Sequence, residues 1–213
     1  MRSLLLVAVL IPAALSGACR SAGSPGAAIV QPGAPGQSTR VIDVARATDL
    51  SQVQFSGADV HFMQGMIGHH AQAVEMVALI AERTRRESLR LLGLRIEVSQ
   101  TDEMALMREW LEARGQTPPD PHAHHMHGAT LMPGMLTPEE MQRLTDARDG
   151  EFDRLFLEGM IKHHQGALTM VDELFASAGA AQDSEIHAFA SDVDADQRME
   201  IDRMGSLLQE IAR

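Results

Sequence analysis

An internal repeat is the feature that most constrains how this chain can fold. The segment "DVHFMQGMIGHHAQAVEM" begins at Asp59 and recurs as "DRLFLEGMIKHHQGALTM" from Asp153, an offset of 153 − 59 = 94 residues without a gap. A second similar pair, "QTDEMALMREWL" from Gln100 and "QRMEIDRMGSLL" from Gln197, has an offset of 197 − 100 = 97 residues. Each half holds two related segments, which predicts two copies of one structural unit packed against each other.

All four segments have the periodicity of amphipathic helices. In the first, residues recur on one face at steps of three and four: Asp59, Phe62, Met66, His70, Ala73 and Val77. "TRRE" at Thr84, "TPEE" at Thr137 and "DSEI" near Asp183 predict where the other three helices begin, and the third is expected to run to about Ser177. The predicted fold is all-α, an antiparallel four-helix bundle made of two duplicated helical hairpins.

The N-terminal region is predicted to be a targeting segment followed by a tether. Residues 1–18 have the Arg, the apolar run and the small residues of a secretory signal peptide. "LSGAC" resembles the cleavage motif of lipoproteins, although Ser16 stands where Leu is more usual, and cleavage before Cys19 would leave its thiol ready for acylation. Plain export and an uncleaved anchor are the alternatives. Residues 19–47, rich in Gly, Pro, Ser and Ala, are predicted to be a flexible, lipid-anchored tether. We therefore expect an exported bacterial protein that is periplasmic or anchored to the membrane as a lipoprotein.

The remaining residues, 48–213, are predicted to form one duplicated domain. Its halves are 48–115 and 137–213, joined by a connector at 116–136 that is rich in His and Met. The formal net charge is −11 and no run of Lys and Arg is present, which argues against nucleic acid as a partner. Cys19 is the only cysteine, so the domain has no disulfide and no thiolate metal site.

Two His doublets are the first candidate metal ligands. Each follows a Met by three and four residues, which gives two sets of ligands: Met66, His69 and His70, and Met160, His163 and His164. Neighbouring helical residues point about 100° apart, so either His can share an ion with the Met, whereas both on one small ion would be strained. The alternative is that these side chains only fill the core.

The connector is the second candidate. Residues 121–135, "PHAHHMHGATLMPGM", interleave imidazole and thioether side chains: His122, His124, His125, Met126, His127, Met132 and Met135. A loop with Pro and Gly has no core to fill, so the pattern favours metal capture over a merely solvated loop. Met104 and Met107, one turn apart on the second helix, are further candidate ligands, although Met at helical spacing is also typical of a core.

The donor types favour copper. Thioether sulfur is a soft donor that prefers Cu(I), and imidazole binds both Cu(I) and Cu(II). No Glu is followed by His three residues later, which argues against a di-iron carboxylate centre, and no acidic calcium-binding loop is present. We expect copper as the bound metal, with Cu(I) favoured and Cu(II) also compatible.

These motifs resemble the domain of unknown function 305 family. "FMQGMIGHHAQAVEM", "MPGMLTPEEMQRL" and "FDRLFLEGMIKHHQGALTM" carry the resemblance, which covers roughly residues 48–212. The first doublet is followed by "AQA" where the second has "QGA", so Gln72 is displaced by one place relative to Gln165. The resemblance implies an exported, ferritin-like helical protein that binds copper, and it implies no settled mechanism.

Three functions remain open at this point. The first is a periplasmic copper-binding protein that sequesters copper or transfers it, with the metal ion and copper-transport proteins as partners. The second is a copper-dependent redox enzyme, and the third is a structural or partner-binding helical bundle without metal. No nucleophile or acid–base pair marks a catalytic centre, so no catalytic residue is predicted and binding is favoured over catalysis.

Overall fold

The computed structural model describes residues 28–31, 38–47, 55–125 and 130–212. They belong to two compact units, a small one that ends at Leu50 and a large one that begins at Ser51. The predicted signal peptide, the proposed lipidation site at Cys19, and the candidate ligands Met126 and His127 lie outside the described residues.

The small unit is a two-stranded hairpin followed by one helical turn. Strands β1 (Ile29–Gln31) and β2 (Arg40–Ile42) pair antiparallel with Ile29 opposite Ile42, and α1 spans Val44–Ala47. The prediction of a flexible tether rested on the Gly, Pro, Ser and Ala content and did not include this hairpin. The strands consist mostly of β-branched residues, which favour extended backbone. Val30 and Val41 remain exposed, and the role of this region as a tether stays a prediction.

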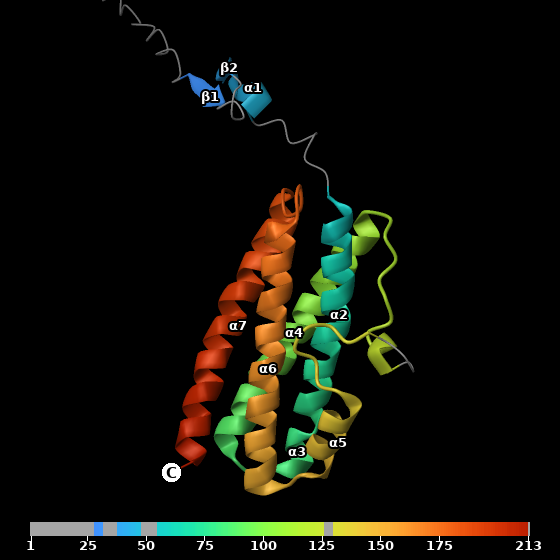
Figure 1. Cartoon of the computed structure of the whole chain (residues 1–213), viewed down its shortest axis with the longest axis vertical. Coiled ribbons are helices and arrows are strands. Elements are labelled where there is room, and N and C mark those ends of the chain that lie inside the picture. Colours follow the sequence, from blue (N-terminus) through green and yellow to red (C-terminus); the bar gives the residue numbers. More distant parts are fainter. Residues whose placement is uncertain (1–27, 32–37, 48–54, 126–129, 213) are drawn as a thin grey trace, which may run out of the picture. The chain divides into compact units, whose positions relative to one another are not determined.

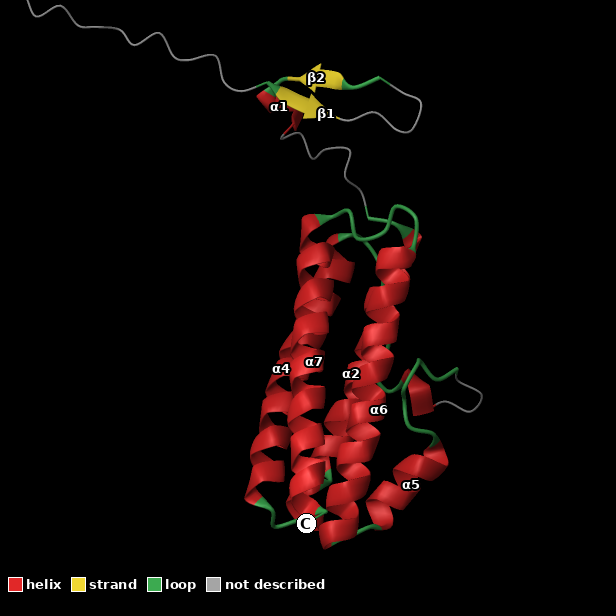
Figure 2. Ribbon diagram, turned by 60° about the vertical axis from the view of Figure 1, so that its left-hand side comes forward, coloured by secondary structure: helices red, strands yellow, loops and turns green. Residues whose placement is uncertain are grey.

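The large unit is all-α. Four long helices lie side by side, and α2 packs against α4 and α6 while α6 packs against α7 (Figures 1 and 2). Their bounds are α2 Gly57–Ala78, α4 Glu87–Ala113, α6 Asp149–Ala176 and α7 Ser184–Ile211. Shorter elements join them: α3 Ile80–Arg83, the 3-10 turn η1 Ala123–His125 and α5 Pro138–Asp146. In Figure 1 each packed pair runs antiparallel. Within the described residues, no helix has the length and apolar character needed to cross a membrane.

Side-chain caps mark the starts of α2, α5 and α7. Thr137 forms the predicted capping box with Glu140 at the start of α5, and Asp183 caps α7 as predicted. The box predicted at Thr84 is wrong: Thr84 Oγ1 accepts from the Arg86 backbone N–H, and α4 begins only at Glu87.

The prediction of one continuous third helix from Thr137 is also wrong. Extended backbone at Ala147 and Arg148 separates α5 from α6. Asp149, the first residue of α6, has a φ of 50°, and Gly150 follows it. The apolar spacing continues across the break, so periodicity alone does not reveal it.

Two buried aspartates tie each hairpin to the turn of the other. Asp59 Oδ1 accepts a hydrogen bond of 2.7 Å from the Ala181 backbone N–H, in the turn between α6 and α7. Its repeat partner Asp153 accepts one of 2.6 Å from Arg86 Nε, between α3 and α4. Each aspartate thus accepts a hydrogen bond from the other hairpin, which accounts for the Asp at the start of each repeat.

A polar layer divides the apolar core of the large unit into two clusters. On each long helix these polar residues lie between members of one cluster and members of the other; on α2, Met66 belongs to one and Met76 to the other. The layer consists of His69, His70, Gln100, Glu103, His163, His164, Gln197 and Glu200. Because buried polar groups need partners, the hydrogen bonds of this layer decide what it can do.

Candidate metal centre

The first histidines of the two doublets lie against each other, with their rings tilted by 38°. His69 and His163 have ring centroids 3.8 Å apart and are fully buried. His163 Nε2 donates to the His69 carbonyl oxygen at 2.9 Å, and His69 Nε2 donates to the Pro133 carbonyl oxygen at 3.0 Å. This pair therefore joins α2, α6 and the connector.

The second histidine of each doublet meets a carboxylate. His70 Nε2 lies 2.6 Å from Glu103 Oε2, and His164 Nε2 lies 2.7 Å from Glu200 Oε2. The two glutamates are 200 − 103 = 97 residues apart, the offset of the second repeated segment. The sequence left open which His of each doublet turns inward, and both are buried.

All four imidazoles leave Nδ1 buried without a partner among the described residues. Since Nε2 faces an acceptor in each case, any of these rings that is neutral carries its proton on Nε2 and its lone pair on Nδ1. Burial and the neighbouring His70 lower the pKa of His69 to about 3, and burial with the adjacent His69 holds the pKa of His163 well below its usual range. A ring that donates one N–H to a carbonyl or carboxylate while keeping the other nitrogen free is the usual state of a metal-ligating His.

The connector crosses the bundle at the level of this layer. Gln72 Nε2 donates to the Leu136 carbonyl oxygen at 2.9 Å, and the Leu136 N–H donates to Gln72 Oε1 at 2.7 Å. The repeat partner of Gln72 is Gly166, where a Cβ would overlap the Pro133 carbonyl and lie 2.6 Å from Gly134 Cα. In the first half Gln72 binds the connector, and in the second half the absence of a side chain at Gly166 leaves space for it.

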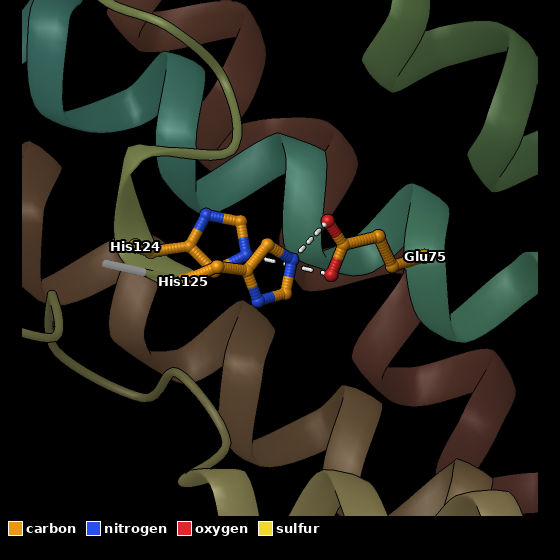
Figure 3. A group of neighbouring side chains, drawn as sticks. All are labelled: Glu75, His124 and His125. Atoms are coloured by element: carbon orange, nitrogen blue, oxygen red, sulfur yellow. Dashed lines mark hydrogen bonds and ion pairs between the residues drawn. The ribbon is translucent and has the colours of Figure 1, made fainter. Parts of the chain in front are cut away.

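Three connector histidines gather around Glu75, on the outer side of α2. His122 Nδ1 and His125 Nε2 both lie 2.8 Å from Glu75 Oε1, and His124 Nε2 lies 3.4 Å from Oε2. Figure 3 shows the rings of His124 and His125 reaching from the connector toward the carboxylate. One ligand atom from each of Glu75, His124 and His125 lies within 4.8 Å of the others. Among the described residues, no other His, Asp, Glu or Cys group of three meets that criterion.

The contacts within this cluster shift the pKa values of Glu75 and His124. Burial raises the pKa of the Glu75 carboxyl, but hydrogen bonds from His124, His125 and His122 outweigh it and lower the pKa to about 2. The hydrogen bond to Glu75 in turn raises the pKa of His124. An anion that already attracts cationic imidazole can attract a metal cation in place of the protons.

The structure distributes the predicted ligands among several places. Met66, Met160, Met107 and Met135 are buried, whereas Met104 and Met132 are partly buried. It brings His122, His124 and His125 together, and it gathers the two doublets within the polar layer. Glu75 was not predicted and has no signal in the sequence, because its partners lie at least 122 − 75 = 47 residues away. Glu103 and Glu200 were also missed, although their match in the repeat could have identified them.

Comparisons with known proteins agree with this helical core. A DUF305 fragment from Deinococcus radiodurans has 32% sequence identity and a TM-score of 0.63, covering 73% of this chain and 98% of that one. A candidate secreted DUF305 protein from Streptomyces coelicolor has 28% identity and the same TM-score, covering 73% and 94%. CopM in the Cu(II)-bound form has 25% identity and a TM-score of 0.59, covering 71% and 96%. No curated protein matches. The family described as "Domain of unknown function (DUF305)" matches residues 59–208, and the chain belongs to this family.

Proposed function

We propose that this protein is an exported copper-binding protein that sequesters or transfers copper through His and Met side chains. The observation that carries the proposal is the convergence of His122, His124 and His125 on Glu75. The helical scaffold is proposed to be a ferritin-like four-helix bundle that arose by duplication. Attachment to a membrane through lipidated Cys19 and delivery of copper to transport proteins belong to the same proposal.

The donor set at Glu75 fits Cu(II). Imidazole nitrogen and carboxylate oxygen are borderline to hard donors, and Cu(II) accepts both. Two of the three imidazoles are exposed, so an ion can reach them from solvent. His124 is nearly buried and would fix the inner side of such a site.

The polar layer offers a second set of nitrogen donors. Four Nδ1 atoms are free, their rings are oriented through Nε2, and Met66 and Met160 each lie one helical turn from a doublet. Within the described part of this layer no three nitrogen or oxygen ligands converge, so an ion here would need thioether donors as well.

The relatives support the same assignment. One is CopM, which was solved in a Cu(II)-bound form, and another is named as a candidate secreted protein. Both similarities extend over nearly the whole of the related chain. Copper binding and export are therefore the properties that we transfer to this chain as proposals.

The test is Cu(II) binding by the full chain at neutral pH, followed by calorimetry and electron paramagnetic resonance. We expect the double variant His124→Ala/His125→Ala to bind Cu(II) at least about 100-fold more weakly, because it removes two imidazole ligands. It should also lose nitrogen hyperfine structure from its spectrum. The control is His187→Ala, which removes another exposed histidine and should leave binding unchanged. Equal affinity of the double variant and the parent protein would refute the proposal.

A further inference from the structure

A notch at Gly65 brings two thioethers together beside the connector. A Cβ placed on Gly65 would lie 3.3 Å from Met170 Cε and 3.4 Å from Met132 Sδ. The missing side chain therefore leaves space on α2 that Met170 of α6 and Met132 of the connector both approach. Sequence reasoning did not single out Met170, because a Met on an apolar helical stripe is more often a core residue.

The repeat supplies a second notch for comparison. Gly159 is the repeat partner of Gly65, since 65 + 94 = 159, and Met76 is the partner of Met170. A Cβ on Gly159 would lie 3.3 Å from Met76 Cε and 3.2 Å from Leu136 Cδ2. The connector thus places a thioether in one notch and an aliphatic side chain in the other, so packing space alone does not require sulfur at position 132.

The Gly65 notch is open to an ion and has a third sulfur nearby. Met132 is only partly buried and lines a cleft of about 260 Å³ together with Met135 and His124. Met135 Sδ accepts the Met132 backbone N–H at 3.3 Å, which keeps its thioether beside the notch. Of the imidazole cluster, only His124 lines this cleft, and Met170 lines a second cleft of about 150 Å³ that Met132 also borders.

We propose that Met132 and Met170, assisted by Met135, form a separate site for a soft monovalent cation, Cu(I) or Ag(I). Neutral thioether sulfur selects such ions over Cu(II), which prefers the nitrogen and oxygen donors at Glu75. This inference rests on the proposed function in that both assign metal to the connector. It adds that the two oxidation states of copper occupy different sites, one at Glu75 and one at the thioethers of Met132 and Met170.

Ag(I) tests the site because it is soft and does not change oxidation state under the conditions of a titration. The full chain, labelled with ¹³C at its Met methyl groups, is titrated with Ag(I) and observed by NMR. The signals of Met132 and Met170 should shift first, and that of Met76 should not. Met132→Leu should weaken Ag(I) binding at least about tenfold, whereas Met76→Leu, the same change in the other notch, should not.

A gain of binding provides the reciprocal test. Leu136→Met places a thioether opposite Met76, so the Met76 signal should then respond to Ag(I). Equal affinity of Met132→Leu and Met76→Leu, or a shift of Met76 in the parent protein, would overturn the inference. The variant His124→Ala/His125→Ala separates it from the proposed function: it should lose Cu(II) binding and retain the Ag(I) shifts of Met132 and Met170.

Discussion

Replacing Gly166 by Ala should destabilise the protein by roughly 3 kcal/mol or more, because the new methyl group meets backbone rather than flexible side chains. Its Cβ would overlap the Pro133 carbonyl and lie 2.6 Å from Gly134 Cα. The connector must then move off the helix, and the hydrogen bond from His69 to Pro133 is lost with it. Urea unfolding followed by circular dichroism measures the change in the free energy of unfolding.

Gly205→Ala is the matched control for this substitution. Gly205 lies within α7, and a Cβ there would meet nothing within 4 Å. Replacing a helical Gly by Ala at such a position should stabilise the protein by about 0.5 to 1 kcal/mol. If the two variants had the same stability, the close crossing of the connector over α6 would be wrong.

Acidification should destabilise the metal-free protein by roughly 4 to 5 kcal/mol between pH 6.5 and pH 4.5. The folded state lowers the pKa of His69 to about 3 and that of His163 well below its usual value of 6.5. The unfolded chain therefore binds two protons in this range that the folded chain does not, and each contributes about 1.4 kcal/mol per pH unit. Urea unfolding at several pH values in the presence of a chelator measures the slope.

The other shifted groups near the connector do not obscure this window. The lowered pKa of Glu75 gives stability that is lost only as the pH falls below 4.5 toward 2. The raised pKa of His124 gives stability that is fully present below 6.5 and is lost as the pH rises. His163→Gln should halve the slope between pH 6.5 and pH 4.5, whereas His187→Gln on the surface should leave it unchanged. A free energy of unfolding that stays constant across this range would contradict the assignment of buried neutral rings.

The sequence predicted those parts of the structure that depend on short-range patterns. Periodicity and the Thr137 capping box are local, and both were correct. The break at Ala147 and Arg148 has no Pro to reveal it. The start of α4 is displaced because the Arg86 side chain turns to Asp153, a contact between residues that are 153 − 86 = 67 apart.

The site shows the same limit more sharply. The sequence shows which histidines the connector carries, but not that they gather at Glu75, since Glu75 stands on the outer side of a helix like any other surface carboxylate. Gln72 appeared misaligned with Gln165 in the sequence. The position that matches Gln72 in the repeat is Gly166. The two residues differ because the connector is present once: Gln72 binds it, and Gly166 leaves space for it. Contacts between segments that are distant in the sequence, rather than composition, determine the roles of Glu75 and Gln72.

The crossed contacts of Asp59 and Asp153 have a consequence for how the molecule holds together. Each hairpin, taken alone, would keep an aspartate that lacks the donor supplied by the other hairpin, and a buried carboxylate without its partner is costly. We therefore expect that neither half folds stably alone. A chain cleaved within the connector should remain together as two associated fragments. The connector is therefore not needed to hold the two halves together, and its contacts with Gln72, His69 and Gly166 instead fix its own path across the bundle.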